Sequence, residues 1–166
     1  MYWKIRKGLD VVLEFIVIVV MGILVLDVTW QVFTRFIMKH PSHWTEELAT
    51  FLMIWVGLLG ASVALNRGAH LGVDYFVGLL SPRKKLYAES AAFLFVSLFS
   101  LLVLVVGGCK LVALTFMREQ ISPALGLNMG YVYLALPISG FFLVLYSTEF
   151  MCKSIGVLLK RDMEKR

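Results

Sequence analysis

The chain has 166 residues, of which 60% are hydrophobic and only 16% are charged, and its mean hydropathy is +0.84. Soluble domains carry roughly 45–50% apolar and about 25% charged residues, so this composition excludes an ordinary soluble protein and indicates a membrane protein. The net charge of +5 does not indicate nucleic-acid binding, because the basic residues stand in short clusters between apolar runs, as is typical of membrane topology.

Four apolar segments are long enough to cross a bilayer as helices, which takes about 20 residues each. We expect these spans at residues 11–33, 48–65, 88–117 and 131–158. Backbone polar groups cannot stay unpaired in lipid, so such runs form helices. Pro137 lacks an amide hydrogen and is expected to bend the fourth helix. The predicted fold class is an all-α membrane protein, with residues 1–166 as one integral membrane domain because no polar linker divides them.

Lysine and arginine predict the orientation, because these residues gather in cytoplasmic loops. If the N-terminus is cytoplasmic, twelve of the 16 basic residues lie on the cytoplasmic side and three on the outer side, with Lys110 inside the third span. Both termini are therefore expected in the cytoplasm. Cys109 and Cys152 then lie near opposite membrane faces, too far apart to form a disulfide.

The first span holds ionisable side chains, which lipid penalises. Glu14 lies near the cytoplasmic edge, where its carboxylate reaches water. Asp27 is deeper, and Gln31 and Arg35 follow it on the same helix face at i+4 and i+8. We predict that Asp27 pairs with Arg35 or Lys110 and thereby holds the first helix in the bundle. A proton or ion relay through Asp27 is the functional alternative.

The second span begins within HPSHWTEELATFL, residues 40–52, which gathers two histidines, a tryptophan and two glutamates. Thr45 is the expected N-cap. Glu46 and Glu47 would then occupy the first turn, where carboxylates are favoured by the positive end of the helix dipole. Trp44 fits the aromatic belt at the membrane interface. Capping and anchoring explain most of this motif, and a docking surface for a partner is the alternative.

Metal and catalytic chemistry are poorly supported by the same motif. His40, His43 and Glu46 have ligand types that suit zinc. However, Pro41 breaks the helical spacing between them and no third strong ligand is evident. Paired glutamates acting as acid and base need a closed pocket, which a loop edge does not offer. All histidines fall in loops, whereas a haem anchor needs them inside its spans. The sequence therefore indicates no enzyme, metal or cofactor.

A stripe of small residues follows in the second span at i, i+3, i+4 and i+7, formed by Gly57, Gly60, Ala61 and Ala64. Such a stripe lets two helix backbones approach closely in lipid. The partner helix belongs either to this chain or to a second subunit.

An apolar segment at residues 70–80 separates the second and third spans and is too short to cross the membrane. Pro82 and three basic residues close it. We expect a short amphipathic helix lying in the cytoplasmic interface, with a buried hairpin as the alternative.

The run WTEELATFLMIWVGLLGASVALNRGAHLGVDYF, residues 44–76, resembles the small membrane subunit, of DctQ type, of tripartite ATP-independent periplasmic (TRAP) transporters. In that family a Trp-x-Glu-Glu entry precedes an apolar span, a Gly-Ala step, and then a basic residue and a histidine before an amphipathic segment. The matching residues here are Trp44, Glu46, Glu47, Gly60, Ala61, Arg67 and His70. Residues 122–140 resemble the family's last loop and proline-bearing span through Pro123, Tyr133 and Pro137. The resemblance covers nearly the whole chain.

The resemblance implies a non-catalytic scaffold subunit of the bacterial inner membrane, in contact with membrane lipids. Its partner would be a large multi-span subunit, similar to elevator transporters, that carries the sodium and substrate sites. A periplasmic binding protein would deliver an organic acid such as a C4-dicarboxylate, sialic acid or another sugar acid. Trp44, Glu46 and Glu47 would lie where a partner approaches. The alternative from another class is a membrane anchor of a respiratory or other enzyme complex.

Overall fold

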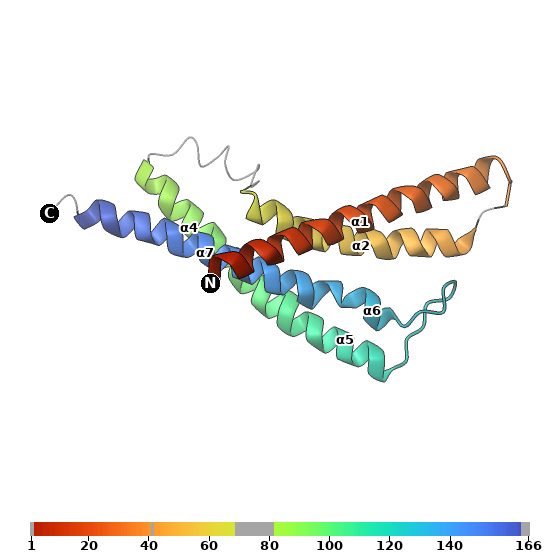
Figure 1. The fold of residues 1–166 in the computed structure, drawn as a ribbon. Helices are drawn as coiled ribbons and strands as arrows, with labels where there is room; N and C mark the ends of the chain where they lie inside the picture. The colour runs from red at the N-terminus through yellow and green to blue at the C-terminus, as the bar shows by residue number, and fades with distance from the viewer. Residues whose placement is uncertain (1, 41, 69–81, 164–166) are drawn as a thin grey trace.

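The computed structural model describes residues 2–40, 42–68 and 82–163. Its elements are α1 (Tyr2–Phe36), α2 (His43–Asn66), α4 (Pro82–Phe99), the π-helical segment η1 (Ser100–Gly107), α5 (Gly108–Met117), α6 (Met129–Tyr133) and α7 (Ala135–Met163) (Figure 1). Over these residues the only β-type pairing is an isolated bridge between Ile121 and Asn128. The all-α prediction is confirmed.

Within the described ranges, four helical runs are long and apolar enough to cross a membrane. They are Arg6–Phe36, His43–Asn66, Lys85–Met117 and Met129–Gly156, so the four predicted spans are confirmed. The expected interfacial helix at residues 70–80, with His70, lies outside the described residues.

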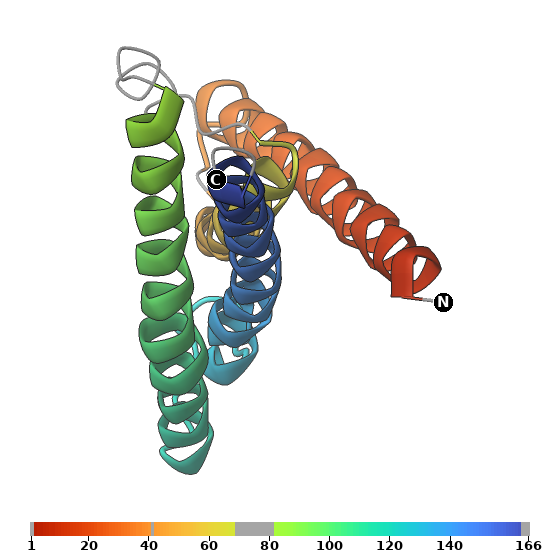
Figure 2. The ribbon, with the colours of Figure 1, turned by 90° about the vertical axis from the view of Figure 1, so that its left-hand side faces the viewer.

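The bundle is built around α2 and α7, which pack against each other, with α1 on α2 and α4 on α7 (Figures 1 and 2). The beginning of α1, the end of α2, the beginning of α4 and the C-terminal part of α7 lie toward one end, called here the Arg6 end (Figure 1). The connections α1–α2 and α5–α6 lie at the other, the Glu47 end. Figure 1 shows the pair α1–α2 diverging from the pair α5–α6 toward the Glu47 end.

The first helix buries only one narrow seam. From Asp10 onward, buried and half-buried positions recur every three or four residues, with Glu14 beside Leu13 as one further half-buried position: Asp10, Leu13, Val17, Val20, Leu24, Asp27, Gln31 and Thr34. This is the heptad spacing of coiled-coil packing, and it faces α2. The rest of the helix surface is apolar and open: Phe15 is 65% exposed and Leu26 is 72% exposed. Such a surface requires lipid or another protein around it.

Close helix packing in this chain depends on glycines that the small-residue stripe did not include. A Cβ on Gly140 would lie 2.7 Å from Leu104 Cβ, and one on Gly108 would lie 3.1 Å from Pro137 Cδ. Gly140 therefore brings α7 onto the backbone of η1. The π-helical turn itself was not predicted, because nothing in its apolar sequence departs from an α-helical pattern.

The fourth span is interrupted at Leu134, between α6 and α7. Pro137 has no amide hydrogen for the carbonyl of Tyr133, one turn earlier, so the regular hydrogen-bond pattern cannot continue through this point. Ile138 N still donates to the Leu134 carbonyl at 3.3 Å. The predicted disturbance at Pro137 is thus found as a break one turn before the proline.

Candidate functional site

The second helix begins two residues earlier than its predicted cap. Ser42 occupies the N-cap position with extended backbone (φ −91°, ψ 111°). Thr45 lies within the first turn, fully buried, and its Oγ1 donates to the Ser42 carbonyl at 2.8 Å. The prediction of Thr45 as N-cap is therefore wrong, because it is Ser42 that has the non-helical backbone a cap requires.

Glu47 is the polar link between two distant parts of the chain at this end. Its Oε2 accepts hydrogen bonds from the amides of Ala124, at 2.9 Å, and Leu125, at 2.7 Å. Both amides belong to the connection between α5 and α6. Hydrogen bonds to a carboxylate are stronger than those between neutral groups. Glu47 with these two amides, called here the Glu47 clamp, thus holds the start of α2 against that connection.

The connection clamped by Glu47 has its own internal hydrogen bonds. Ser122 N donates to the Leu127 carbonyl at 2.8 Å, and Gly126 N donates to the Ser122 carbonyl at 3.1 Å. Asn128 then caps α6, its Oδ1 accepting from Gly130 N at 2.8 Å. The connection is therefore an ordered turn, and the clamp fixes it as a unit relative to α2.

A groove of about 470 Å³ lies beside the clamp, lined by His43, Glu46, Glu47, Thr50, Pro123 and Ala124. Of the three residues predicted to cap or dock, Glu47 is engaged inside the chain. Glu46 is exposed, and Trp44 is 46% exposed. The two glutamates therefore have different roles, and only Glu46 and Trp44 present their side chains outward.

The structure brings no metal site together in the part of the chain that it describes. No group of three His, Cys, Asp or Glu side chains there is placed to hold an ion. Cys109 and Cys152 are both free and exposed, as expected from their predicted separation.

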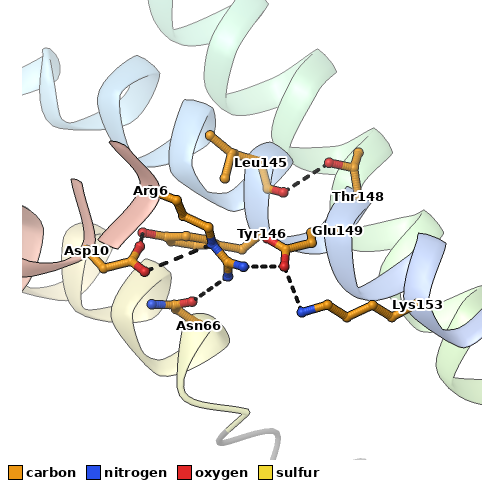
Figure 3. Close-up of polar contacts among 8 residues, drawn as sticks. All are labelled: Arg6, Asp10, Asn66, Leu145, Tyr146, Thr148, Glu149 and Lys153. Carbon is orange, nitrogen blue, oxygen red and sulfur yellow. Dashed lines mark hydrogen bonds and ion pairs between the residues drawn. The ribbon is translucent and has the colours of Figure 1, made fainter. Parts of the chain in front are cut away.

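The Arg6 end carries a second polar cluster, which joins three helices (Figure 3). It consists of Arg6 and Asp10 from α1, Asn66 from α2, and Tyr146, Glu149 and Lys153 from α7, called here the Arg6 cluster. Arg6 Nη1 donates to Glu149 Oε1, and Arg6 Nη2 donates to Asn66 Oδ1 at 3.1 Å. Tyr146 donates to Asp10 Oδ1 at 2.6 Å.

A separate ion pair links α1 to the end of α2. Arg67 Nε donates to Glu14 Oε1 at 3.0 Å, and Arg67 Nη2 lies 3.0 Å from Glu14 Oε2. This hydrogen bond and the negative charge of Glu14 raise the pKa of Arg67. Arg67, predicted only to flank an interfacial segment, is thus also a partner of the first helix.

The predicted pairing of Asp27 is not formed. Asp27 is only 7% exposed, and its Oδ2 has no hydrogen-bond partner within the described ranges. Lys110 is exposed on α5, and α1 has no close backbone contact with α5 among the described elements. The ion pairs found on α1 lie at the Arg6 end instead.

Sequence reasoning missed the Arg6 cluster, although one signal was available. Opposite charges recur at i and i+4 where the first and last apolar runs meet their polar ends, in Arg6–Asp10 and Glu149–Lys153. Such spacing within one helix usually indicates a solvated pair. Only the packing of α1 beside α2 and α7 shows that these charges also meet across helices.

Four membrane-crossing helices with ordered polar links at both ends define a multi-pass integral membrane protein. Residues 24–156 match the family of the DctQ component of tripartite ATP-independent periplasmic transporters. The chain therefore belongs to this family, which is a family of transporter subunits and not of enzymes.

Similar proteins carry related descriptions. The sialic acid TRAP transporter small permease protein SiaQ of Vibrio cholerae is 28% identical over 155 residues, 93% of this chain and 88% of that protein. The C4-dicarboxylate TRAP transporter small permease protein DctQ of Rhodobacter capsulatus is 30% identical over 57% of this chain and 41% of its own length. The sialic acid TRAP transporter permease protein SiaT of Haemophilus influenzae is 32% identical over 73 residues, 44% of this chain but 11% of that protein.

Proposed function

We propose that this chain is the small scaffold subunit of a sodium-coupled TRAP importer in the bacterial inner membrane. A large multi-span subunit of elevator type would carry the sodium and substrate sites, and a periplasmic binding protein would deliver an organic acid. The observation that carries this proposal is the family match over residues 24–156.

Partnership with a large permease is supported by the SiaT comparison. There, the part similar to this chain makes up only 11% of a permease, so a segment of this kind occurs joined to a much longer membrane protein. The open apolar surface of α1 needs a covering that lipid or such a partner would supply. The small-residue stripe on α2 is a second candidate contact, since a Cβ on Gly57 or Gly60 would meet no atom within 4 Å.

The orientation proposed is with the Arg6 end in the cytoplasm and the Glu47 end outside. Arg6 and Lys7 lie near the beginning of α1, Arg67 at the end of α2, Lys85 near the beginning of α4 and Lys153 in the C-terminal part of α7, so they belong to the Arg6 end. Arg35 and Lys39 lie at the end of α1 and just after it, and Arg118 lies at the end of α5, so they belong to the Glu47 end. This distribution follows the cytoplasmic preference of basic residues. The groove beside the Glu47 clamp then faces the periplasm, where the binding protein approaches.

Candidate substrates are a C4-dicarboxylate, sialic acid or another sugar acid. Relatives described for sialic acid and for C4-dicarboxylates both resemble this chain. No feature of the described residues selects one of them, which is the expected situation for a subunit that does not hold the substrate.

The proposal is tested by expressing this chain with and without a large TRAP permease subunit. We expect the two membrane subunits to purify together in mild detergent. Organic-acid uptake into proteoliposomes should require both subunits, and also the binding protein and an inward sodium gradient. Uptake by the large subunit alone at the full rate, or solute flux through this chain alone, would contradict the proposed role.

Docking of the binding protein is expected to depend on Glu46 rather than on Glu47 directly, because Glu46 is the exposed carboxylate of the pair. Glu46→Lys should slow uptake several-fold at low ionic strength, with a smaller effect at high salt, since exposed charges steer partners through screened interactions. The measurement is the initial uptake rate against salt concentration, with Glu119→Lys, an exposed acid in the α5–α6 connection, as the matched control. Equal salt profiles for Glu46→Lys and the unmodified chain would remove Glu46 from the docking surface.

A further inference from the structure

The first helix is the least supported of the four spans. Its backbone lies close to α2, whereas in the described elements it makes no comparable approach to α4, α5 or α7. Only side chains therefore connect α1 to α7. Those side chains lie at the Arg6 end, where Figure 3 shows α1, α2 and α7 meeting around one guanidinium group.

Arg6 contacts all three helices at once. Its Nη1 donates to Glu149 on α7, its Nη2 donates to Asn66 at the end of α2, and its Nε lies 4.0 Å from Asp10 Oδ2 on its own helix. The guanidinium also lies 5.8 Å from the ring centre of Tyr146, within cation–π range. The side chains of Arg6 and Glu149 are only 15% and 18% exposed, so this contact is largely shielded from water.

The charges of the cluster balance. The cations Arg6 and Lys153 accompany the carboxylates of Asp10 and Glu149, and Lys153 Nζ lies 2.7 Å from Glu149 Oε1. Each charge of the cluster is compensated by a neighbour, so removing one member leaves an uncompensated charge, which is strongly destabilising where it is buried. Arg6 is the member whose removal disconnects most groups, because Glu149 and Asn66 both accept from it.

We propose that Arg6 is a positioning residue that holds the Arg6 end of α1 against α7 and so determines where the apolar face of α1 is presented. A planar guanidinium reaches separate acceptors on separate helices, which the single ammonium of lysine cannot do in the same geometry. Arg6→Lys keeps the positive charge but should hold α1 against α7 only partly, with a result between those of the unmodified chain and Arg6→Gln. The link to transport rests on the proposed function, in which α1 offers a surface to the large subunit.

The position of α1 can be measured in the isolated chain, independently of any partner. In a background with Cys109→Ser and Cys152→Ser, spin labels are placed at Val11 on α1 and Ile155 on α7, which are 60% and 40% exposed. Double electron–electron resonance in lipid nanodiscs should give one narrow distance distribution. Arg6→Gln should widen this distance distribution and lower the thermal midpoint by roughly 6 °C or more.

Two controls separate the proposed contact from general damage. Arg35→Gln changes the same residue type at the other end of the same helix, where Arg35 is exposed, and should leave the distribution unchanged. A label pair at Leu26 and Met53, on the exposed sides of α1 and α2, should stay narrow in Arg6→Gln because the α1–α2 seam persists. An unchanged Val11–Ile155 distribution in Arg6→Gln would overturn the proposal.

A double-mutant cycle tests whether Arg6 acts through Glu149. Arg6→Gln and Glu149→Gln should each lower the thermal midpoint, and the double variant should be no worse than Arg6→Gln alone, because each single change leaves an unpaired charge. Strictly additive losses would show that the two residues act separately and would contradict the proposal.

The effect of Arg6 on transport is measured with the complete transporter, which contains this chain, the large subunit and the binding protein. Arg6→Gln should reduce the maximal uptake rate with the substrate KM unchanged, since the proposed function puts the substrate site in the large subunit. A widened distance with unchanged uptake would refute the link between α1 position and transport. If uptake does not need this chain at all, the proposed function fails, while the distance measurement still decides the role of Arg6.

Discussion

Replacement of Glu47 by alanine is expected to release the α5–α6 connection from the start of α2. Both hydrogen bonds of the clamp, from Ala124 N and Leu125 N, go to one carboxylate oxygen. Without the carboxylate, the two backbone amides must hydrogen-bond to water instead. We expect the free energy that holds the connection closed to fall by about 1–3 kcal/mol. Because the helix pairs diverge toward this end (Figure 1), little else is available to hold the connection in place.

The release can be followed by limited trypsin digestion at Arg118, an exposed residue at the beginning of the connection. If the free energy of opening falls by about 1.4 kcal/mol, the rate of cleavage rises roughly tenfold when opening is fast. Glu46→Ala is the matched control, since Glu46 is adjacent and exposed, and it should be cleaved like the unmodified chain. The cleavage rate of Glu47→Gln should lie between those of Glu47→Ala and Glu46→Ala, because an amide oxygen still accepts hydrogen bonds but carries no charge. Equal cleavage of the two alanine variants would show that the clamp does not hold the connection.

Replacement of Gly140 by leucine is expected to prevent the normal packing of α7 on η1. Even a Cβ there would lie 2.7 Å from Leu104 Cβ and 3.1 Å from the backbone nitrogen of Val105. A backbone atom cannot turn aside as a flexible side chain can, so the helices must separate. Overpacking typically costs about 1–3 kcal/mol, which exceeds the roughly 0.5–1 kcal/mol gained when glycine leaves a helix interior. The net effect is therefore destabilising, and larger for leucine than for alanine.

For Gly140→Leu the matched control is Gly22→Leu, because it makes the same substitution at a glycine where a Cβ would contact no other described helix. A Cβ on Gly22, in the middle of α1, would meet no atom within 4 Å. The thermal midpoint of the isolated chain in detergent should fall by several degrees in the first variant and stay within about 2 °C in the second. Similar midpoints for both would mean that α7 and η1 do not pack through Gly140.

The candidate site was only partly predictable. The motif at residues 40–52 identified the right region, because an unusual concentration of acids at the mouth of an apolar run is visible in the sequence. It did not separate Glu46 from Glu47, whose difference depends on which of two adjacent side chains faces the α5–α6 connection. Gly57 and Gly60 stay predicted packing positions: a Cβ placed on either would meet no atom of another helix within 4 Å in the described chain, so a helix that packs there would belong to a second subunit.

The amino-acid sequence by itself determined the membrane class, the four spans and the family, because transfer into lipid depends on the summed composition of a local window and the family motif is contiguous. Tertiary structure alone decided that Arg6 meets Glu149 and Asn66, that Gly140 touches η1, and that Asp27 Oδ2 has no hydrogen-bond partner among the described residues. These outcomes depend on the rotation and offset of each helix relative to its neighbours. Residues distant along the chain, such as Arg6 and Glu149, meet only when three helices are placed together, and no local pattern specifies that placement.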